Sequence, residues 1–141
     1  MVCTFFGHRT APDSIRPILH NTLTHLIEKG VDTFYVGNQG NFDAMARRLL
    51  SDLSEEYPIT FTVVLAYLPK EKTDDPERTI YPEGLENVPP RFAVSYRNKW
   101  MLERADVVIT YVSRSFGGAA KYKDLAGKRG KNVIEVSAAD E

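Results

Sequence analysis

The sequence predicts a three-layer α/β fold in which a mainly parallel sheet of about five strands is flanked by helices. One observation behind this prediction is that short apolar segments alternate with longer segments whose apolar residues recur with the helical period. Another is that a polar loop containing glycine follows three of the short segments. Strands that alternate with helices form parallel sheets covered on both faces, through right-handed crossovers.

Five segments are predicted as strands because they are short and rich in β-branched and aromatic residues. They are residues 2–6, 32–36, 59–67, 106–112 and 131–136. Four segments are predicted as helices because their apolar residues follow a period of 3.6. They are residues 13–30, 41–57, 90–105 and 117–130. The alternation runs through the whole chain, so residues 1–141 are expected to form a single domain.

The first helix shows its limits in the sequence. Asp13 or Ser14 can cap its start, Pro17 suits its first turn, and Gly30 can end it. In the second helix the apolar side chains expected to point inward are Phe42, Ala46, Leu49, Leu50 and Leu53.

Residues 68–89 interrupt the alternation. This segment is rich in proline and charge, has no clear period, and follows the third predicted strand. Long aperiodic segments in compact domains are often lids or mobile loops. We therefore expect a lid over a cleft, with Tyr81 and Glu83 facing the ligand.

Composition excludes several classes of function. The net charge is −1, so no overall charge favours nucleic acid or an anionic membrane as a partner. Cys3 is the single cysteine, which excludes an internal disulfide and a cysteine metal cluster and suits the cytoplasm. His8, His20 and His25 do not cluster, so we expect no metal site, and we expect no cofactor. The apolar N-terminal segment is too short for a signal peptide or a membrane span.

Three polar loops follow predicted strands: "GHR" (7–9), "GNQG" (37–40) and "SRSFGG" (113–118). In parallel sheets, ligands bind beyond the carboxyl ends of the strands, near the point where the strand order reverses. All three loops start at a carboxyl end, so we expect them to converge on one edge of the sheet.

The middle loop has two interpretations. Gly37 and Gly40, with Asn38 and Gln39 between them, can let the backbone approach a phosphate at the start of a helix. The alternative is an ordinary turn that needs glycine for a positive φ. The loop matches neither the G-x-G-x-x-G pattern nor the P-loop. Asp43 can either favour the helix dipole or accept a hydrogen bond from a ribose hydroxyl.

The last loop repeats this arrangement. Gly117, Gly118 and Ala119 begin a helix whose amides can bind an anion, and Ser113 and Ser115 supply hydroxyls nearby. The alternative is that Gly118 marks a tight corner under close helix packing.

The first loop places three residues at the same edge: Gly7, His8 and Arg9. Arg9 can bind a phosphate or carboxylate with two parallel hydrogen bonds, and His8 can hydrogen-bond a ligand or act as acid or base. The alternative is a capping arginine and a histidine bonded to the backbone.

The third predicted helix carries a polar pair within an apolar stripe. The side chains that share this face are Val94, Arg97, Asn98 and Met101. A charged residue in such a stripe needs a partner or an opening. Arg97 therefore faces the cleft or forms an ion pair with an acid such as Asp106 or Asp124.

Several segments resemble a known family: "CTFFGHR", "VGNQGNFDAMA", "VVLAYLP", "IYPEGLENVPPRFAVSYRNKWMLERADVVITYV" and "SFGGAAKYKDLA". They look like the bacterial YpsA-like proteins, formerly a domain of unknown function. The match covers nearly the whole chain. That family belongs to the SLOG superfamily with DprA and the LOG phosphoribohydrolases, so the resemblance implies a Rossmann-like domain that binds nucleotides or nucleotide-derived ligands.

The LOG enzymes use an arginine followed four positions later by methionine, together with the motif P-G-G-x-G-T-x-x-E. The resemblance assigns these catalytic roles to Arg97, which precedes Met101, and to Asp124, which aligns with the glutamate. Ala120 and Lys121 replace the third glycine and the threonine, and Asp124 is one methylene shorter than glutamate. We expect phosphate binding to be retained despite these departures, whereas the departures argue against LOG-type hydrolysis.

The sequence thus supports a cytoplasmic protein that binds a nucleotide or an ADP-ribose-like molecule as a sensor or regulator. One alternative is an N-glycosidase acting on a nucleoside 5′-monophosphate, with Arg97 and Asp124 as catalytic residues. Another is a protein-interaction module with a vestigial pocket. The sequence leaves open whether the protein forms a homodimer and which proteins it contacts.

Overall fold

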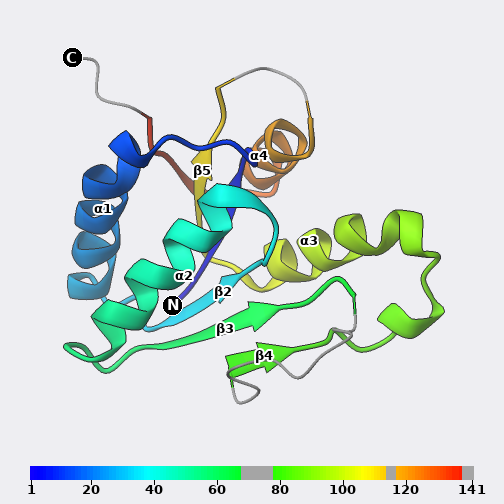
Figure 1. Cartoon of the computed structure of the whole chain (residues 1–141), viewed down its shortest axis with the longest axis horizontal. Coiled ribbons are helices and arrows are strands. Elements are labelled where there is room, and N and C mark those ends of the chain that lie inside the picture. The colour runs from blue at the N-terminus through cyan, green and yellow to red at the C-terminus, as the bar shows by residue number, and fades with distance from the viewer. Residues whose placement is uncertain (68–77, 114–116, 138–141) are drawn as a thin grey trace.

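The structure is a computed structural model that describes residues 1–67, 78–113 and 117–137. Its centre is a six-stranded, all-parallel sheet with the order β4-β3-β2-β1-β5-β6 (Figure 1). The strands are β1 Val2–Gly7, β2 Thr33–Val36, β3 Thr60–Val64, β4 Thr79–Ile80, β5 Val107–Tyr111 and β6 Asn132–Glu135. The helices are α1 Arg16–Glu28, α2 Gly40–Ser54, α3 Ala93–Arg104 and α4 Gly118–Lys128. The predicted three-layer, Rossmann-like α/β fold is confirmed.

The sheet contains one strand more than the sequence predicts. β4 pairs in parallel with β3 and comes from the segment 68–89, which the sequence predicts to be a lid. A strand of two residues shows no alternation, so pattern analysis cannot detect it. Residues 68–77 of that segment lie outside the described residues, and Leu85–Asn87 forms a 3-10 turn.

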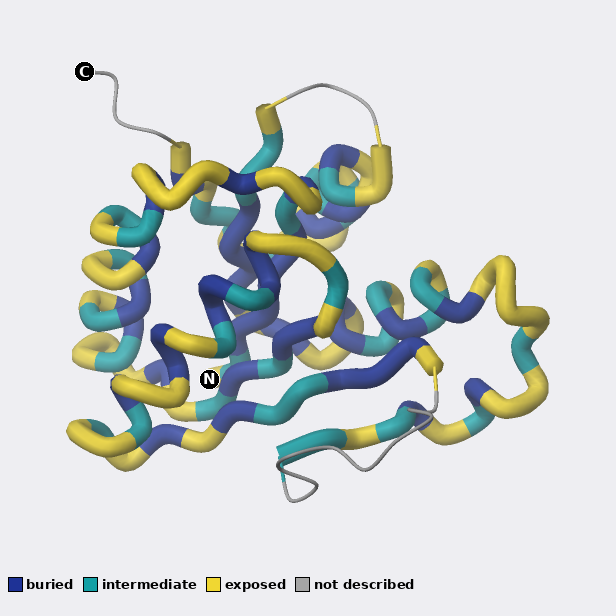
Figure 2. The backbone as a smooth tube through the Cα atoms, in the orientation of Figure 1, coloured by how far each residue is buried: buried dark blue, intermediate teal, exposed yellow. Residues whose placement is uncertain are grey.

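The helices cover the sheet on both faces, and successive residues of β1 show this directly. Phe5 packs into a core cluster with α1 and α2, whereas Phe6 packs into a second cluster with α3 and α4. This is the alternation expected of a strand buried on both faces. Figure 2 shows the buried residues concentrated along the strands and the inner sides of the helices. The five inward-facing side chains predicted for α2 are all buried.

The ends of α1 agree only in part with the sequence. Pro17 lies in the first turn, and Gly30 follows the helix with φ +107°, as predicted. The predicted side-chain caps are wrong: a 3-10 turn of residues Asp13–Ile15 precedes the helix, and no side-chain cap is formed there. The 3-10 turn continues into the helix, so its backbone takes the place of a capping side chain.

The strand order reverses at β1, which lies between β2 and β5. The chain adds β2, β3 and β4 on one side of β1, and then β5 and β6 on the other. The carboxyl ends of β1, β2 and β5 are therefore neighbours, which brings together the three polar loops that follow them.

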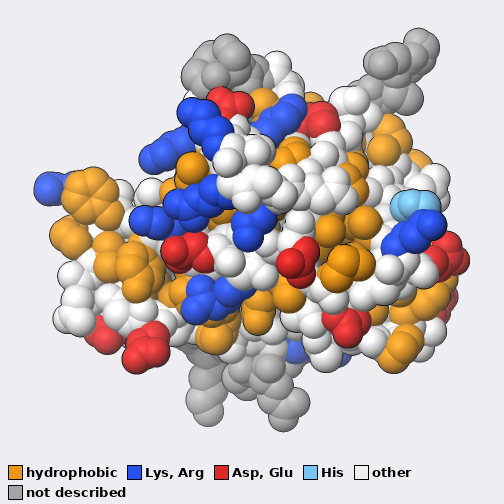
Figure 3. All heavy atoms as spheres, turned by 180° about the vertical axis from the view of Figure 1, so that it is seen from behind, with side chains coloured by type: hydrophobic (Ala, Val, Ile, Leu, Met, Phe, Trp, Pro, Cys, Tyr) orange, Lys and Arg blue, Asp and Glu red, His pale blue; other side chains and the backbone are white. Residues whose placement is uncertain are grey.

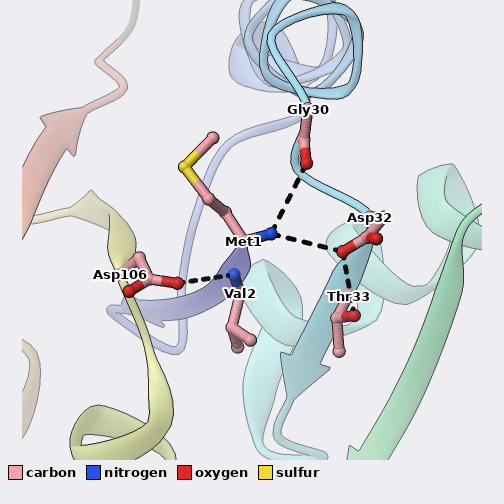
Figure 4. A network of polar contacts seen from close by, with 6 residues as sticks. All are labelled: Met1, Val2, Gly30, Asp32, Thr33 and Asp106. Atoms are coloured by element: carbon pink, nitrogen blue, oxygen red, sulfur yellow. Dashed lines mark hydrogen bonds and ion pairs between the residues drawn. The ribbon is translucent and has the colours of Figure 1, made fainter.

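The opposite end of the sheet is held by polar contacts (Figure 4). The backbone N–H of Val2 donates to Asp106 Oδ2 at 2.9 Å, and the Thr33 hydroxyl donates to Asp32 Oδ1 at 3.1 Å. Next to Val2, Cys3 is fully buried in β1, and burial raises the pKa of its thiol. Cys3 is therefore a core residue, which suits a small apolar side chain.

The surface mixes charges of both signs. Seen from behind in Figure 3, Lys and Arg side chains lie among Asp and Glu and among apolar side chains. Within the described residues, no helix has the length and apolar character that crossing a bilayer requires.

Candidate functional site

A pocket of about 210 Å³ lies at the carboxyl end of β1. Four parts of the chain form it: the end of β1 with its loop, the start of α2, one face of α3, and the start of α4. The residues that line it are Phe5, Phe6, Gly7, His8, Arg9, Gln39, Asp43, Val94, Arg97, Asn98, Met101, Gly118 and Ala119. The predicted convergence of the three loops is therefore confirmed for the described residues.

The polar face of α3 borders this pocket as predicted. Val94, Arg97, Asn98 and Met101 all belong to the lining. They come from successive turns of one helix, so a single rigid element positions them.

Arg97 is the central charged side chain of the pocket and is only 2% exposed. Its Nη1 donates to the Val64 carbonyl at 3.0 Å and to Asn38 Oδ1 at 3.2 Å. Its Nε donates to Asn98 Oδ1 at 2.9 Å. Burial lowers the pKa of the guanidinium, because desolvation penalises its charged form.

The ion pairs suggested for Arg97 from the sequence are wrong. Asp106 lies at the opposite end of the sheet, where it accepts a hydrogen bond from Val2. Asp124 is exposed on α4. The Val64 carbonyl and the amide side chains of Asn38 and Asn98 take their place. Pattern analysis could not show the contacts with Val64 and Asn38, because both residues come from segments distant from α3.

Asp43 supplies a carboxylate to the pocket and is 8% exposed. Its Oδ2 accepts a hydrogen bond from the backbone N–H of Gln39 at 3.0 Å, which holds it against the start of α2. Burial raises the pKa of Asp43. The hydrogen bond from Gln39, followed by the charge of Arg97, works in the opposite direction.

Gly37 leaves room for the Asp43 carboxylate and the Arg97 guanidinium on the same side of the loop. A Cβ at position 37 would lie 2.7 Å from Asp43 Oδ2 and 3.0 Å from Arg97 Nη1. The missing side chain thus leaves the space in which the two charged groups approach one another. Sequence analysis did not predict that both groups lie against the same glycine, and the one signal for it was a glycine at position 37 instead of a larger residue.

The loop 37–40 also braces the loop that follows β1. The Asn41 N–H donates to the Arg9 carbonyl at 2.8 Å, and Arg9 Nη2 donates to Gln39 Oε1 at 3.1 Å. Gly40 has φ +83°, and a Cβ there would lie 2.7 Å from Arg9 Cα. The amides of Gln39 and Asn41 are therefore used inside the protein, as expected for a structural turn.

His8 and Gly7 close the base of the pocket. His8 is 4% exposed, and its ring meets Tyr111 edge-on with centroids 6.2 Å apart. Its backbone N–H donates to the Tyr111 carbonyl at 3.1 Å. A Cβ at Gly7 would overlap the ring of Phe42, so glycine lets α2 pack closely on the end of β1.

The start of α4 forms the remaining wall. Gly117 precedes the helix with φ +99°, and the Lys121 N–H donates to the Gly117 carbonyl at 3.1 Å. Amides before that bond have no partner within a helix. A Cβ at Gly118 would meet no described atom within 4 Å, so this residue borders open space. Ser113 is exposed beyond β5, and Ser115 lies outside the described residues.

Several predicted site residues are outside the pocket lining. They include Gly37, Asn38, Gly40, Ser113 and Gly117, which lie near it, and Asp124, Tyr81 and Glu83, which lie elsewhere. Asp124 lines a separate shallow hollow on α4 with Lys121, Leu125 and Lys128. Tyr81 packs against an apolar cluster near the start of α3, and Glu83 accepts a hydrogen bond from Tyr96 through its carbonyl. None of the described residues from 78 to 89 lines the pocket.

Among the described residues, no group of three or more side chains is arranged to hold a metal ion. The guanidinium groups of Arg9 and Arg97 and the amide side chains of Gln39 and Asn98 give the pocket several hydrogen-bond donors. The chain matches no protein-family model, and no curated protein matches it. The resemblance to the YpsA-like family therefore stays a prediction that rests on the quoted motifs.

Proposed function

We propose that the pocket binds the sugar phosphate of a nucleotide or nucleotide-derived molecule, and that the protein is a cytoplasmic sensor or regulator of that ligand. The observation that carries this proposal is a buried arginine beside a helix start whose first residue, Gly118, borders open space.

The hydrogen bonds of Arg97 support this assignment. Its Nε and Nη1 are held by protein acceptors, while no hydrogen bond among the described residues involves Nη2. A guanidinium fixed in this way is ready to bind a phosphate or carboxylate oxygen, because little side-chain entropy remains to be lost. The start of α4 adds amide donors and positive potential on the facing wall.

The size of the pocket limits what it can hold. Its volume of about 210 Å³ is below the roughly 300–1,000 Å³ typical of drug-sized ligand pockets. We therefore assign the sugar phosphate to the pocket and place the base of the nucleotide beyond its mouth.

A glycosidase is the second candidate, and Asp43 is the observation in its favour. A buried carboxylate with a raised pKa beside a guanidinium is a common feature of catalytic sites. The residue that the LOG comparison assigns to this role, Asp124, is exposed and outside the pocket. Any hydrolysis in this pocket would therefore depend on Asp43.

The test is thermal unfolding with nucleoside 5′-monophosphates and ADP-ribose, using the parent protein, Gly118→Val and Gly127→Val. A ligand at 100 times its Kd should stabilise the parent by about 2.7 kcal/mol. Gly118→Val should lose this stabilisation because valine fills the space for the phosphate. Gly127→Val is a matched control, since Gly127 is an exposed residue of α4 that also borders open space.

Two results would contradict the proposal. The first is a Gly118→Val protein that is folded and stabilised as strongly as the parent. The second is a parent protein that none of these ligands stabilises, which would favour the interaction module with a vestigial pocket.

A further inference from the structure

A second and larger hollow, of about 550 Å³, lies between α2 and the strands β3 and β4. β3 contacts both α2 and its sheet neighbour β4 (Figure 1). The hollow shares no lining residue with the pocket described above. Its volume falls within the range of about 300–1,000 Å³ that is typical of ligand pockets.

The polar part of the hollow is dominated by arginine. Arg47 and Arg48 come from α2 and Arg78 precedes β4, while Asp52 is the acid in the described lining. This excess of positive charge contrasts with the net charge of −1 of the whole chain. Concentrated positive charge in a concave surface attracts anionic ligands.

The three guanidinium groups are held differently. Arg47 Nη1 donates to the Gly37 carbonyl at 3.0 Å, which fixes this side chain over the hollow. Arg78 stacks on the ring of Phe61, with its Cζ 4.4 Å from the ring centroid. Arg48 is exposed and makes no hydrogen bond or ion pair within the described part of the chain. Planar guanidiniums in such an arrangement suit phosphate oxygens.

The floor of the hollow is apolar. Phe61 and Val63 of β3 share one face of the strand, and Leu65, directly after the strand, continues this alternation and also lines the hollow. An inorganic anion would not use this floor, whereas a ligand with a flat apolar part would bury surface against it. The combination of an arginine cluster and an apolar floor selects a molecule that carries both parts.

We propose that this hollow is a second ligand site that takes a nucleoside phosphate, with the phosphates on the arginines and the base on the β3 floor. The proposal does not depend on the pocket at the end of β1, because the two linings are formed by different residues.

The test is an NMR titration of the ¹⁵N-labelled protein with ADP, inorganic diphosphate and adenosine as separate probes. ADP should cause saturable amide shifts at the lining residues Ala44, Ser51 and Val63. It should bind more tightly than diphosphate or adenosine. The same shifts should persist in Gly118→Val, which separates this site from the first pocket.

Arg48→Gln should weaken ADP binding at this site by about 10-fold, as expected for the loss of a charge-assisted hydrogen bond. Arg129→Gln is the matched control, because Arg129 is an exposed arginine at the end of α4, outside both linings. Three results would overturn the proposal. They are no saturable shifts at the lining residues, equal affinity for diphosphate and ADP, and equal affinity in Arg48→Gln and Arg129→Gln.

Discussion

Gly37 is the residue on which the geometry of the candidate site depends. Its missing side chain lets Asp43 and Arg97 approach the same space, and both of those side chains are held by further hydrogen bonds. Glycine here serves close approach and not a special backbone angle, since φ at this position is not in the left-handed region. Even one added methyl group at this position should therefore lower the stability of the protein.

Gly37→Ala should destabilise the protein by about 1–3 kcal/mol, because the new Cβ would displace a buried carboxylate or guanidinium. It should also weaken ligand binding in the pocket. Gly127→Ala is the control, since its Cβ would enter open space in α4 and should stabilise by roughly 0.5 kcal/mol. Urea unfolding measures both changes, and equal effects of the two substitutions would contradict the proposed role of Gly37.

Asp43 predicts a pH dependence of stability. Its pKa is raised above the ordinary value of 3.8, so the native state binds this proton more tightly than the unfolded state. The resulting stabilisation is complete below pH 3.8 and is lost as the pH rises through the native pKa.

Asp43→Asn should remove this contribution to the pH dependence of stability. The free energy of unfolding of the variant should therefore fall less than that of the parent as the pH rises above about 4. The amide oxygen can still accept the hydrogen bond from Gln39, which keeps the start of α2 in place. Urea unfolding at a series of pH values measures the difference. Parallel pH profiles for the two proteins would show that the pKa of Asp43 is not raised on folding.

At the scale of elements, α4 carries both the predicted anion-binding residues and the predicted catalytic acid, but the structure places them in different surroundings. Gly118 and Ala119 at its start line the pocket, whereas Asp124 lies further along and is exposed in a different hollow. A helix turns by 100° per residue, so residues within one short motif can face different surroundings. The motif resemblance pointed to residues at the start of α4 that line the pocket, while the helix geometry separates Asp124 from them.

Asp124→Asn should therefore leave ligand binding unchanged, and neither it nor the parent should release free base from nucleoside 5′-monophosphates. Chromatography of the incubated nucleotides measures release, with Asp43→Asn as a comparison. Base release by the parent that disappears in Asp124→Asn would restore the LOG-type assignment. Loss in Asp43→Asn alone would instead favour a glycosidase that depends on the buried carboxylate.

At the scale of the whole molecule, the sheet topology brings the candidate site together. β1 lies between β2 and β5, so loops that are far apart in the sequence meet at one edge. α3 then crosses that edge and delivers Arg97 to the carbonyl of Val64 at the end of β3. The second hollow lies beside β3, where β4 extends the sheet. Arg78, which directly precedes β4, is part of its lining.

The sequence by itself determined the fold class, the order of the main strands and helices, and the face of α3 that meets the pocket. These features follow from local periodicity and from the rule that parallel strands share their carboxyl edge. Tertiary structure decided that Asp43 and Arg97 both lie against Gly37, that Asp124 lies outside the pocket, and that β4 joins the sheet. Such features depend on how segments distant in the chain pack against each other, and no local pattern of residues records those distances.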